Sequence, residues 1–85
     1  MVLRLLRQTE ISKRHLFGRS TLYEHIRTGV FPAPIKSSNH TSAWLEHESD
    51  AIICARIMGR SDAELRALVL ELVADRAKLA DRITA

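Results

Sequence analysis

The chain has 85 residues, of which 46% are hydrophobic and 27% are charged. This length supports one small domain with one appended helix, and it excludes a multi-layer enzyme with a deep enclosed pocket. The composition is that of a folded protein rather than a disordered one, and the longest apolar run, residues 51–55, is too short to span a bilayer.

Charge is distributed unevenly along the chain. Residues 1–45 carry seven Lys or Arg against two acidic residues, whereas residues 46–85 carry six against eight, within a net charge of +3. All four histidines lie in the first 47 residues. This asymmetry predicts one half that faces a polyanion and a second half with another task.

The first predicted elements are short. Residues 2–6 are typical of a brief edge strand or an extended lead-in. Thr9 is expected to cap a helix that runs to about His15, with Glu10 in its first turn. A second helix is predicted over residues 19–28, because Leu22 and Ile26 lie one turn apart and Gly29 stands where a left-handed cap belongs.

An extended segment and a hairpin follow. Pro32 and Pro34 exclude helix between the second helix and the hairpin. Residues 35–36 and 43–45 form two short arms around a polar tip, which predicts a β-hairpin.

Two more helices complete the predicted chain. The first covers residues 46–58, and its apolar face is expected to comprise Ala51, Ile52, Cys54, Ala55 and Met58. Ser61 and Glu64 form the capping box of a last helix that runs to about Arg82.

This order of elements is that of a winged helix-turn-helix, mainly α with a small β-hairpin, with an added C-terminal helix. We expect residues 1–58 to form a DNA-binding domain and residues 59–85 to form an amphipathic helix that serves as an oligomerisation element. The expected core of the domain comprises Leu5, Ile11, Leu22, Ile26, Trp44, Ile52 and Ala55.

Several segments are familiar when taken together. They are Arg4-Leu5-Leu6-Arg7, Arg19-Ser20-Thr21-Leu22-Tyr23, Gly29-Val30-Phe31-Pro32-Ala33-Pro34-Ile35-Lys36, Ala43-Trp44 and Asp50-Ala51. Over residues 3–58 the chain resembles the AlpA-like family of small phage and prophage regulatory proteins. The resemblance implies an excisionase-like, MerR-like winged helix-turn-helix that binds DNA in a bacterial host.

The chain also departs from the pattern of that family. Gly18 stands where the family usually has a capping serine, and His15-Leu16 replace a usual Thr-Gly turn. Glu24 and His40 stand where basic residues are common. These departures predict a modest affinity of the monomer for DNA.

The second helix is the expected recognition helix. With Leu22 and Ile26 buried, its opposite face is polar and can approach phosphates and base edges. The candidate DNA contacts on this helix are Arg19, Ser20, Thr21, Tyr23, Glu24 and Arg27. The alternative interpretation is a solvated surface helix in which Tyr23 supports the core.

The hairpin is the expected wing and the second DNA contact. Its candidate contacts are Lys36, Ser38, Asn39 and His40, which offer a charge, hydroxyl and amide donors and a titratable ring. The alternative is a plain polar turn. Trp44 is expected in the core and not as a platform for stacked bases.

Catalytic and metal chemistry have little support in the sequence. His47 and Cys54 share one side of a predicted helix, but no second cysteine or paired histidine spacing completes a zinc site. Glycine-rich phosphate loops and nucleophile elbows are missing. We expect a non-enzyme without metal or cofactor.

The last helix carries an apolar stripe of its own. The stripe comprises Leu65, Leu68, Val69, Leu72, Leu79 and Ile83, and Arg76 interrupts it. Either this helix folds back on the winged domain or it joins a second copy, and we favour self-association as a homodimer or a cooperative oligomer on DNA.

These features predict a sequence-specific regulator that binds promoter or attachment-site DNA of a prophage or another mobile element. It would control transcription of integrase and excision genes or act as an excisionase beside the recombinase. The alternative is a protein-interaction adaptor that docks an integrase or another phage partner through the last helix. The single cysteine and the lack of a signal peptide pattern or membrane segment predict a cytoplasmic, nucleoid-associated protein.

Overall fold

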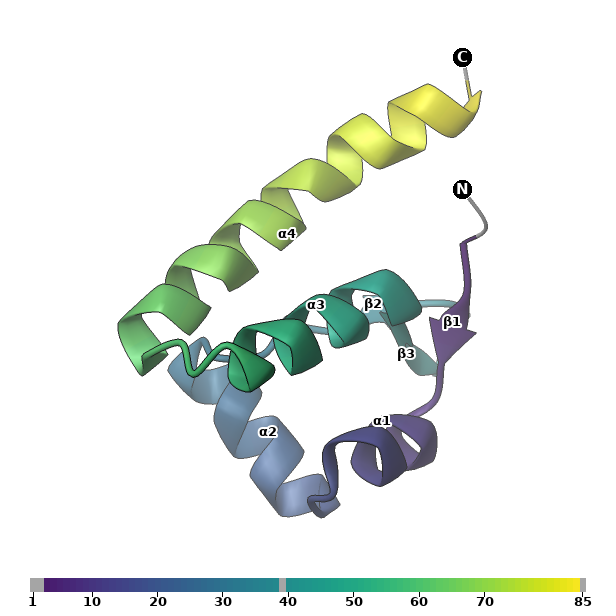
Figure 1. The fold of residues 1–85 in the computed structure, drawn as a ribbon. Helices are drawn as coiled ribbons and strands as arrows, with labels where there is room; N and C mark the ends of the chain where they lie inside the picture. The colour runs from purple at the N-terminus through teal and green to yellow at the C-terminus, as the bar shows by residue number, and fades with distance from the viewer. Residues whose placement is uncertain (1–2, 39, 85) are drawn as a thin grey trace.

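The computed structural model describes residues 3–38 and 40–84 and contains four helices and three short strands within them (Figure 1). In chain order they are β1 (Leu5–Leu6), α1 (Gln8–His15), α2 (Arg19–Thr28), β2 (Ile35–Lys36), β3 (Ser42–Leu45), α3 (Glu46–Ile57) and α4 (Asp62–Thr84). The predicted winged helix-turn-helix with an added C-terminal helix is confirmed. Figure 1 shows α1 and α2 on one side of α3 and α4 on the other.

The three strands form one small antiparallel sheet in the order β1-β3-β2. Leu6 pairs with Trp44 across β1 and β3, and Ile35 pairs with Ala43 across β2 and β3. The β2–β3 hairpin is the predicted wing, and β1 is the predicted edge strand. The sheet therefore joins the start of the chain to the base of the wing.

One hydrophobic core holds the helices and the sheet together. Its buried side chains are Leu6, Ile11, Leu22, Val30, Phe31, Trp44, Ile52, Ala55, Leu65 and Val69, with Phe17, Ile26, Leu68 and Leu72 packed against them. The prediction that Leu5 belongs to this core is wrong. Because neighbouring side chains on a strand point to opposite faces, Leu6 is buried and Leu5 is 46% exposed.

The start of α1 also differs from the prediction. The helix begins at Gln8 with Arg7 as its N-cap, so Thr9 lies inside the first turn and does not cap it. The backbone N–H of Arg7 donates to Glu10 Oε1 at 3.0 Å. The predicted capping box of α4 is confirmed, because the N–H of Ser61 donates to Glu64 Oε1 at 2.9 Å and the N–H of Glu64 donates to Ser61 Oγ at 3.2 Å.

The buried face of α3 is narrower than predicted. Ile52 and Ala55 are buried as expected, but Cys54 is exposed and Met58, the C-cap, is 68% exposed. Two positions along a helix rotate a side chain by about 200°, which carries Cys54 away from the core that Ile52 enters.

The last helix shares the core of the winged domain. Leu65 and Val69 are 1% and 7% exposed, and both belong to the cluster that contains Trp44 and Phe31. The predicted division at residue 58 therefore separates two segments of a single packed unit.

A buried ion pair fixes α4 along its length. The guanidinium of Arg76 donates to both carboxylate oxygens of Glu48, from Nε to Oε2 at 2.8 Å and from Nη2 to Oε1 at 2.6 Å. The same Nη2 donates to the carbonyl of Ala33 at 2.8 Å. Glu48 is only 2% exposed, and the hydrogen bonds to its carboxylate raise the pKa of Arg76. Arg76 thus ties α4 to α3 and to the segment before the wing.

A second arginine of α4 contacts the C-terminal end of α2. Arg66 Nε donates to the carbonyl of Thr28 at 3.0 Å, next to the left-handed Gly29. The last carbonyls of a helix lack partners within it, so Arg66 satisfies one of them.

Replacing Arg76 by Ala should lower the free energy of unfolding by about 3 kcal/mol, because it leaves the Glu48 carboxylate buried without its partner. The measurement is urea denaturation followed by circular dichroism. Lys78→Ala is the matched control: Lys78 is exposed and lies 3.9 Å from Asp75, and its loss should change stability by less than about 0.5 kcal/mol. Equal effects of the two variants would contradict the importance of the buried pair.

Candidate nucleic-acid interface

The polar face of α2 is open to solvent. Leu22 is fully buried and Ile26 packs against the core, as the sequence predicted. All six candidate contact residues on this helix are exposed: Arg19, Ser20, Thr21, Tyr23, Glu24 and Arg27. The helix therefore presents these side chains to any molecule that approaches from this side.

The N-terminus of α2 is suited to a negatively charged ligand. Gly18 is the N-cap, with extended backbone angles and no side chain to satisfy the first N–H groups, and the first turn contains no acidic residue. The first N–H groups of a helix have no partner within it and carry partial positive charge. This end of α2 thus favours an anion such as phosphate.

Three aromatic and cationic side chains stack where α2 meets the sheet. The Arg19 guanidinium carbon lies 5.6 Å from the centroid of the Tyr23 ring. Tyr23 in turn meets Trp44 edge-on, with centroids 6.3 Å apart. Trp44 is 2% exposed, so its predicted core role is confirmed, and Tyr23, which is 40% exposed, supports the Arg19 guanidinium with its ring.

Glu24 and Arg27 form an ion pair on the exposed face. Arg27 Nε donates to Glu24 Oε2 at 3.0 Å, and Arg27 Nη2 also contacts the second carboxylate oxygen. This hydrogen bonding holds the pKa of Glu24 below its usual range. The sequence analysis placed Glu24 and Arg27 on this face as two separate DNA contacts. Their spacing of three residues on a helix already predicts an ion pair.

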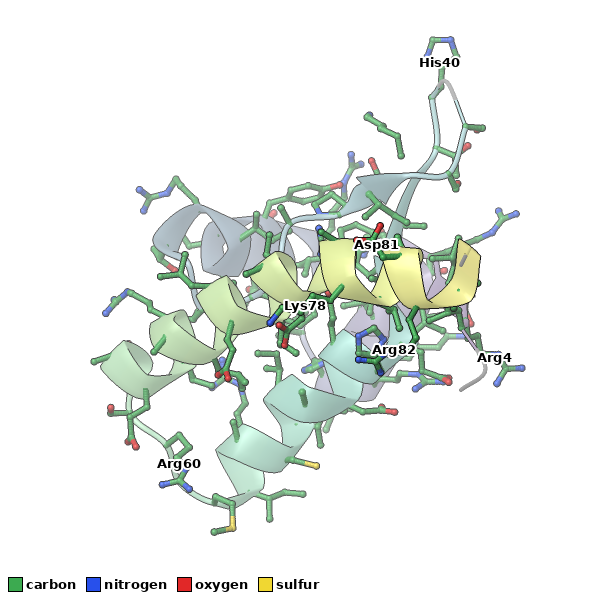
Figure 2. The ribbon with its side chains drawn as sticks, turned by 90° about the horizontal axis from the view of Figure 1, so that it is seen from above. Arg4, His40, Arg60, Lys78, Asp81 and Arg82 are labelled. Atoms are coloured by element: carbon green, nitrogen blue, oxygen red, sulfur yellow. The ribbon has the colours of Figure 1, made fainter. Side chains whose placement is uncertain are left out.

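The wing extends from the sheet as a narrow loop. The N–H of Ser37 donates to the carbonyl of Thr41 at 3.0 Å and closes the turn. Lys36, Ser38 and His40 are exposed, and Figure 2 shows His40 at the tip, well away from the helices. The predicted contact Asn39 lies outside the described residues.

A cleft of about 330 Å³ lies between α2, the start of α1 and the wing. It is lined by Arg7, Gln8, Arg19, Tyr23, His40, Thr41, Ser42 and Trp44, none of which is acidic. The sequence did not identify Arg7 and Gln8 as site residues. Arg7 lies within the segment that resembles the family, but only the tertiary structure brings it beside Arg19.

Ion pairing divides the cations of the basic half into two groups. Arg14 pairs with Glu46 at 2.8 Å, and Arg4 lies 3.7 Å from the same carboxylate. Within the described part of the chain, Arg7, Arg19 and Lys36 have no carboxylate partner. Lys13 on α1 is also exposed and unpaired among the described residues, so the charge available to an external anion lies at the cleft, on the wing and on α1.

His15 supports α2 from behind. Its ring stacks on Phe17 and meets Phe31 edge-on, at centroid distances of 5.4 and 5.0 Å, and Nε2 lies 2.8 Å from Ser49 Oγ. Burial, followed by the nearby charge of Arg56, lowers the pKa of His15. The His15 ring thus packs the turn between α1 and α2 against α3.

The lowered pKa of His15 predicts a loss of stability in mild acid. Below about pH 6.5 the unfolded chain takes up a proton that the folded chain still refuses, so the free energy of unfolding falls until the pH passes the folded pKa. Urea midpoints measured between pH 8 and pH 5 should fall more for the wild type than for His15→Gln. His40→Gln, at the exposed wing tip, should retain the wild-type profile, and a His15→Gln profile that also matched the wild type would refute the assignment.

Most side chains of the apolar stripe of α4 pack against the rest of the same chain. Leu65 and Val69 are buried in the core, Leu68 and Leu72 pack against it, and Leu79 is partly buried. Ile83 is 53% exposed. Of the two arrangements that the sequence left open, the structure shows the intramolecular one for the first four side chains, and it buries Leu65 and Val69 away from any second copy.

Within residues 3–38 and 40–84, no cluster of His, Cys, Asp or Glu side chains is suited to hold a metal ion. The helices in this part of the chain are all too short or too polar to cross a membrane.

Comparison with known proteins gives two matches. Residues 4–57 match the family model described as "Prophage CP4-57 regulatory protein (AlpA)". The uncharacterised protein ORF88 of Enterobacteria phage P4 is 44% identical over 59 residues, which cover 67% of this chain. The match spans 65% of the length of ORF88. No solved structure matches the chain significantly.

Proposed function

The chain belongs to the AlpA family of prophage regulatory proteins, and from this we propose that it regulates its element by binding double-stranded DNA through α2 and the wing. The matched segment, residues 4–57, includes both of these elements together with β1, α1 and α3. The proposed ligand is promoter or attachment-site DNA of a prophage or integrative element.

The observation that carries this proposal is the distribution of unpaired cations. Arg7, Arg19 and Lys36 have no carboxylate partner in the described part of the chain. Arg7 and Arg19 line a cleft without acidic residues, and Lys36 lies on the wing, where it pairs with the lining residue Ser42. Positive side chains and the N-terminus of a helix are the groups that proteins use to contact DNA phosphates. The exposed face of α2 can then reach base edges in the major groove.

The regulatory outcome is either control of integrase and excision genes or a direct role as an excisionase beside the recombinase. Both roles need a protein that recognises a short DNA sequence. A footprint across the integration locus of the host element distinguishes them, because protection would lie over a promoter in the first case and inside an attachment site in the second.

Self-association on DNA remains part of the proposal. A module of this size contacts few base pairs, and neighbouring copies raise the effective concentration of each contact. Leu65 and Val69 are occupied in the core, so the contact between copies would use other surfaces.

Replacing Arg27 by Ala should weaken binding to the cognate site by about 1–3 kcal/mol, as expected for a contact to a base edge. Part of this loss would come from Glu24, whose carboxylate is left without its partner beside the DNA. The double variant Glu24→Gln/Arg27→Ala separates the two effects, because it removes the repulsion together with the contact. Fluorescence anisotropy on a labelled duplex measures both, and wild-type affinity in both variants would remove Arg27 from the interface.

Replacing Lys36 by Ala should weaken binding almost equally on all sequences and should reduce the slope of log K against log salt concentration by about one. The physical reason is that a lysine on the wing contacts phosphate and carries no base information. The control is Lys78→Ala, an equal loss of charge on α4. An unchanged slope for Lys36→Ala would show that the wing does not contact the DNA backbone.

A further inference from the structure

We propose that the cleft between α1, α2 and the wing seats one phosphate of the DNA backbone, with the guanidinium groups of Arg7 and Arg19 as its two cations. This inference rests on the proposed function and adds α1 to the interface. The sequence analysis assigned no contact to α1, and neither Arg7, its N-cap, nor Gln8, its first residue, is among the sequence-derived contacts.

The two arginines reach the cleft from different elements. Arg7 is the N-cap between β1 and α1, and its backbone N–H is already bonded to Glu10. Its side chain is exposed and has no carboxylate partner among the described residues. Arg19 lies in the first turn of α2 and is held over the ring of Tyr23. Two guanidinium groups that line one cleft suit an oxyanion that can accept several hydrogen bonds.

The remaining lining groups also suit an anion. Thr41 and Ser42 contribute hydroxyl groups from the wing, and the uncapped start of α2 lies at the same cleft. The side chain of Lys36 stands on the same face of the sheet as that of Ser42, because these two residues pair directly across β2 and β3. Positive charge therefore continues from the cleft along the wing.

A buried donor lines the same cleft. The indole Nε1 of Trp44 is fully buried and has no hydrogen-bond acceptor among the described residues. Buried polar groups normally have partners, so this unpaired N–H is an exception, and it belongs to a side chain that lines the cleft. The indole N–H therefore lies close enough to the cleft to report on a ligand that binds there.

The position of the cleft favours the DNA backbone over a free anion. The cleft is lined by residues of both α2 and the wing, so a DNA strand that contacts both elements would pass close to it. A phosphate held there would fix the register of α2 in the groove, which is the usual role of contacts to the backbone.

The test measures the salt dependence of binding to a labelled 20-base-pair duplex for the wild type, Arg7→Ala and Arg60→Ala. Arg60 is the matched control, because Figure 2 places it in the turn between α3 and α4, at the opposite end of the molecule from His40. Arg7→Ala should lower the slope by about 0.9, so the ratio of affinities at 50 and 200 mM salt falls about threefold. Arg60→Ala should leave this ratio unchanged.

Two further measurements protect the test. Arg7→Lys should keep the wild-type slope while it loses affinity, because it retains the charge and loses the planar fork. Trp44 is the only tryptophan of the chain, so its indole N–H gives one assigned resonance. That resonance should shift when the duplex binds the wild type and should shift less in Arg7→Ala, whose fold is checked by a thermal melt.

The outcomes separate the two proposals. If the wild type binds the duplex and Arg7→Ala matches Arg60→Ala in slope and in the shift of the indole resonance, the phosphate seat is wrong and the DNA-binding proposal stands. If the wild type does not bind the duplex even in low salt, the proposed function fails and the seat fails with it.

Discussion

The rest of the structure depends on one buried ion pair between α3 and α4. Glu48 is 2% exposed on α3, and Arg76 of α4 satisfies both of its oxygens while it also binds the carbonyl of Ala33. An ion that leaves water needs a partner with matching geometry, and a guanidinium fork provides it. This requirement fixes where α4 lies on α3, and it holds the segment that leads into the wing.

Helix α4 also contacts the C-terminal end of α2. Arg66 binds the carbonyl of Thr28, and Leu65 enters the core beside Phe31 and Trp44. The positions of α2 and of the segment before the wing therefore depend on their contacts with α4. Under the proposed function, the contacts of α4 to Thr28 and Ala33 would hold α2 and the wing in fixed positions relative to each other.

Local patterns in the sequence predicted most of the helices and strands. The features that the sequence analysis missed depend mainly on tertiary contacts. The spacing of Leu22 and Ile26 and the left-handed Gly29 determine α2 within ten residues, and Ser61 and Glu64 determine the start of α4. An apolar stripe shows only that a helix face is covered, so the sequence could not distinguish the protein's own core from a second copy. In the sequence, Arg76 only interrupts the apolar stripe of the last helix. Its partner Glu48 lies 28 residues away, so the ion pair could not be predicted from local spacing. Arg7 was missed because only folding brings it to Arg19.

The most direct test of the central claim is a map of amide chemical-shift changes when a duplex from the integration locus is added to the labelled protein. If α2, the start of α1 and the wing bind DNA, the largest changes fall in residues 7–8, 19–27 and 36–42, with small changes along the exposed side of α4. Changes confined to α4, around Leu70 and Val73, with α2 and the wing unaffected, would contradict it. Such a result would favour an adaptor that docks a partner through its last helix.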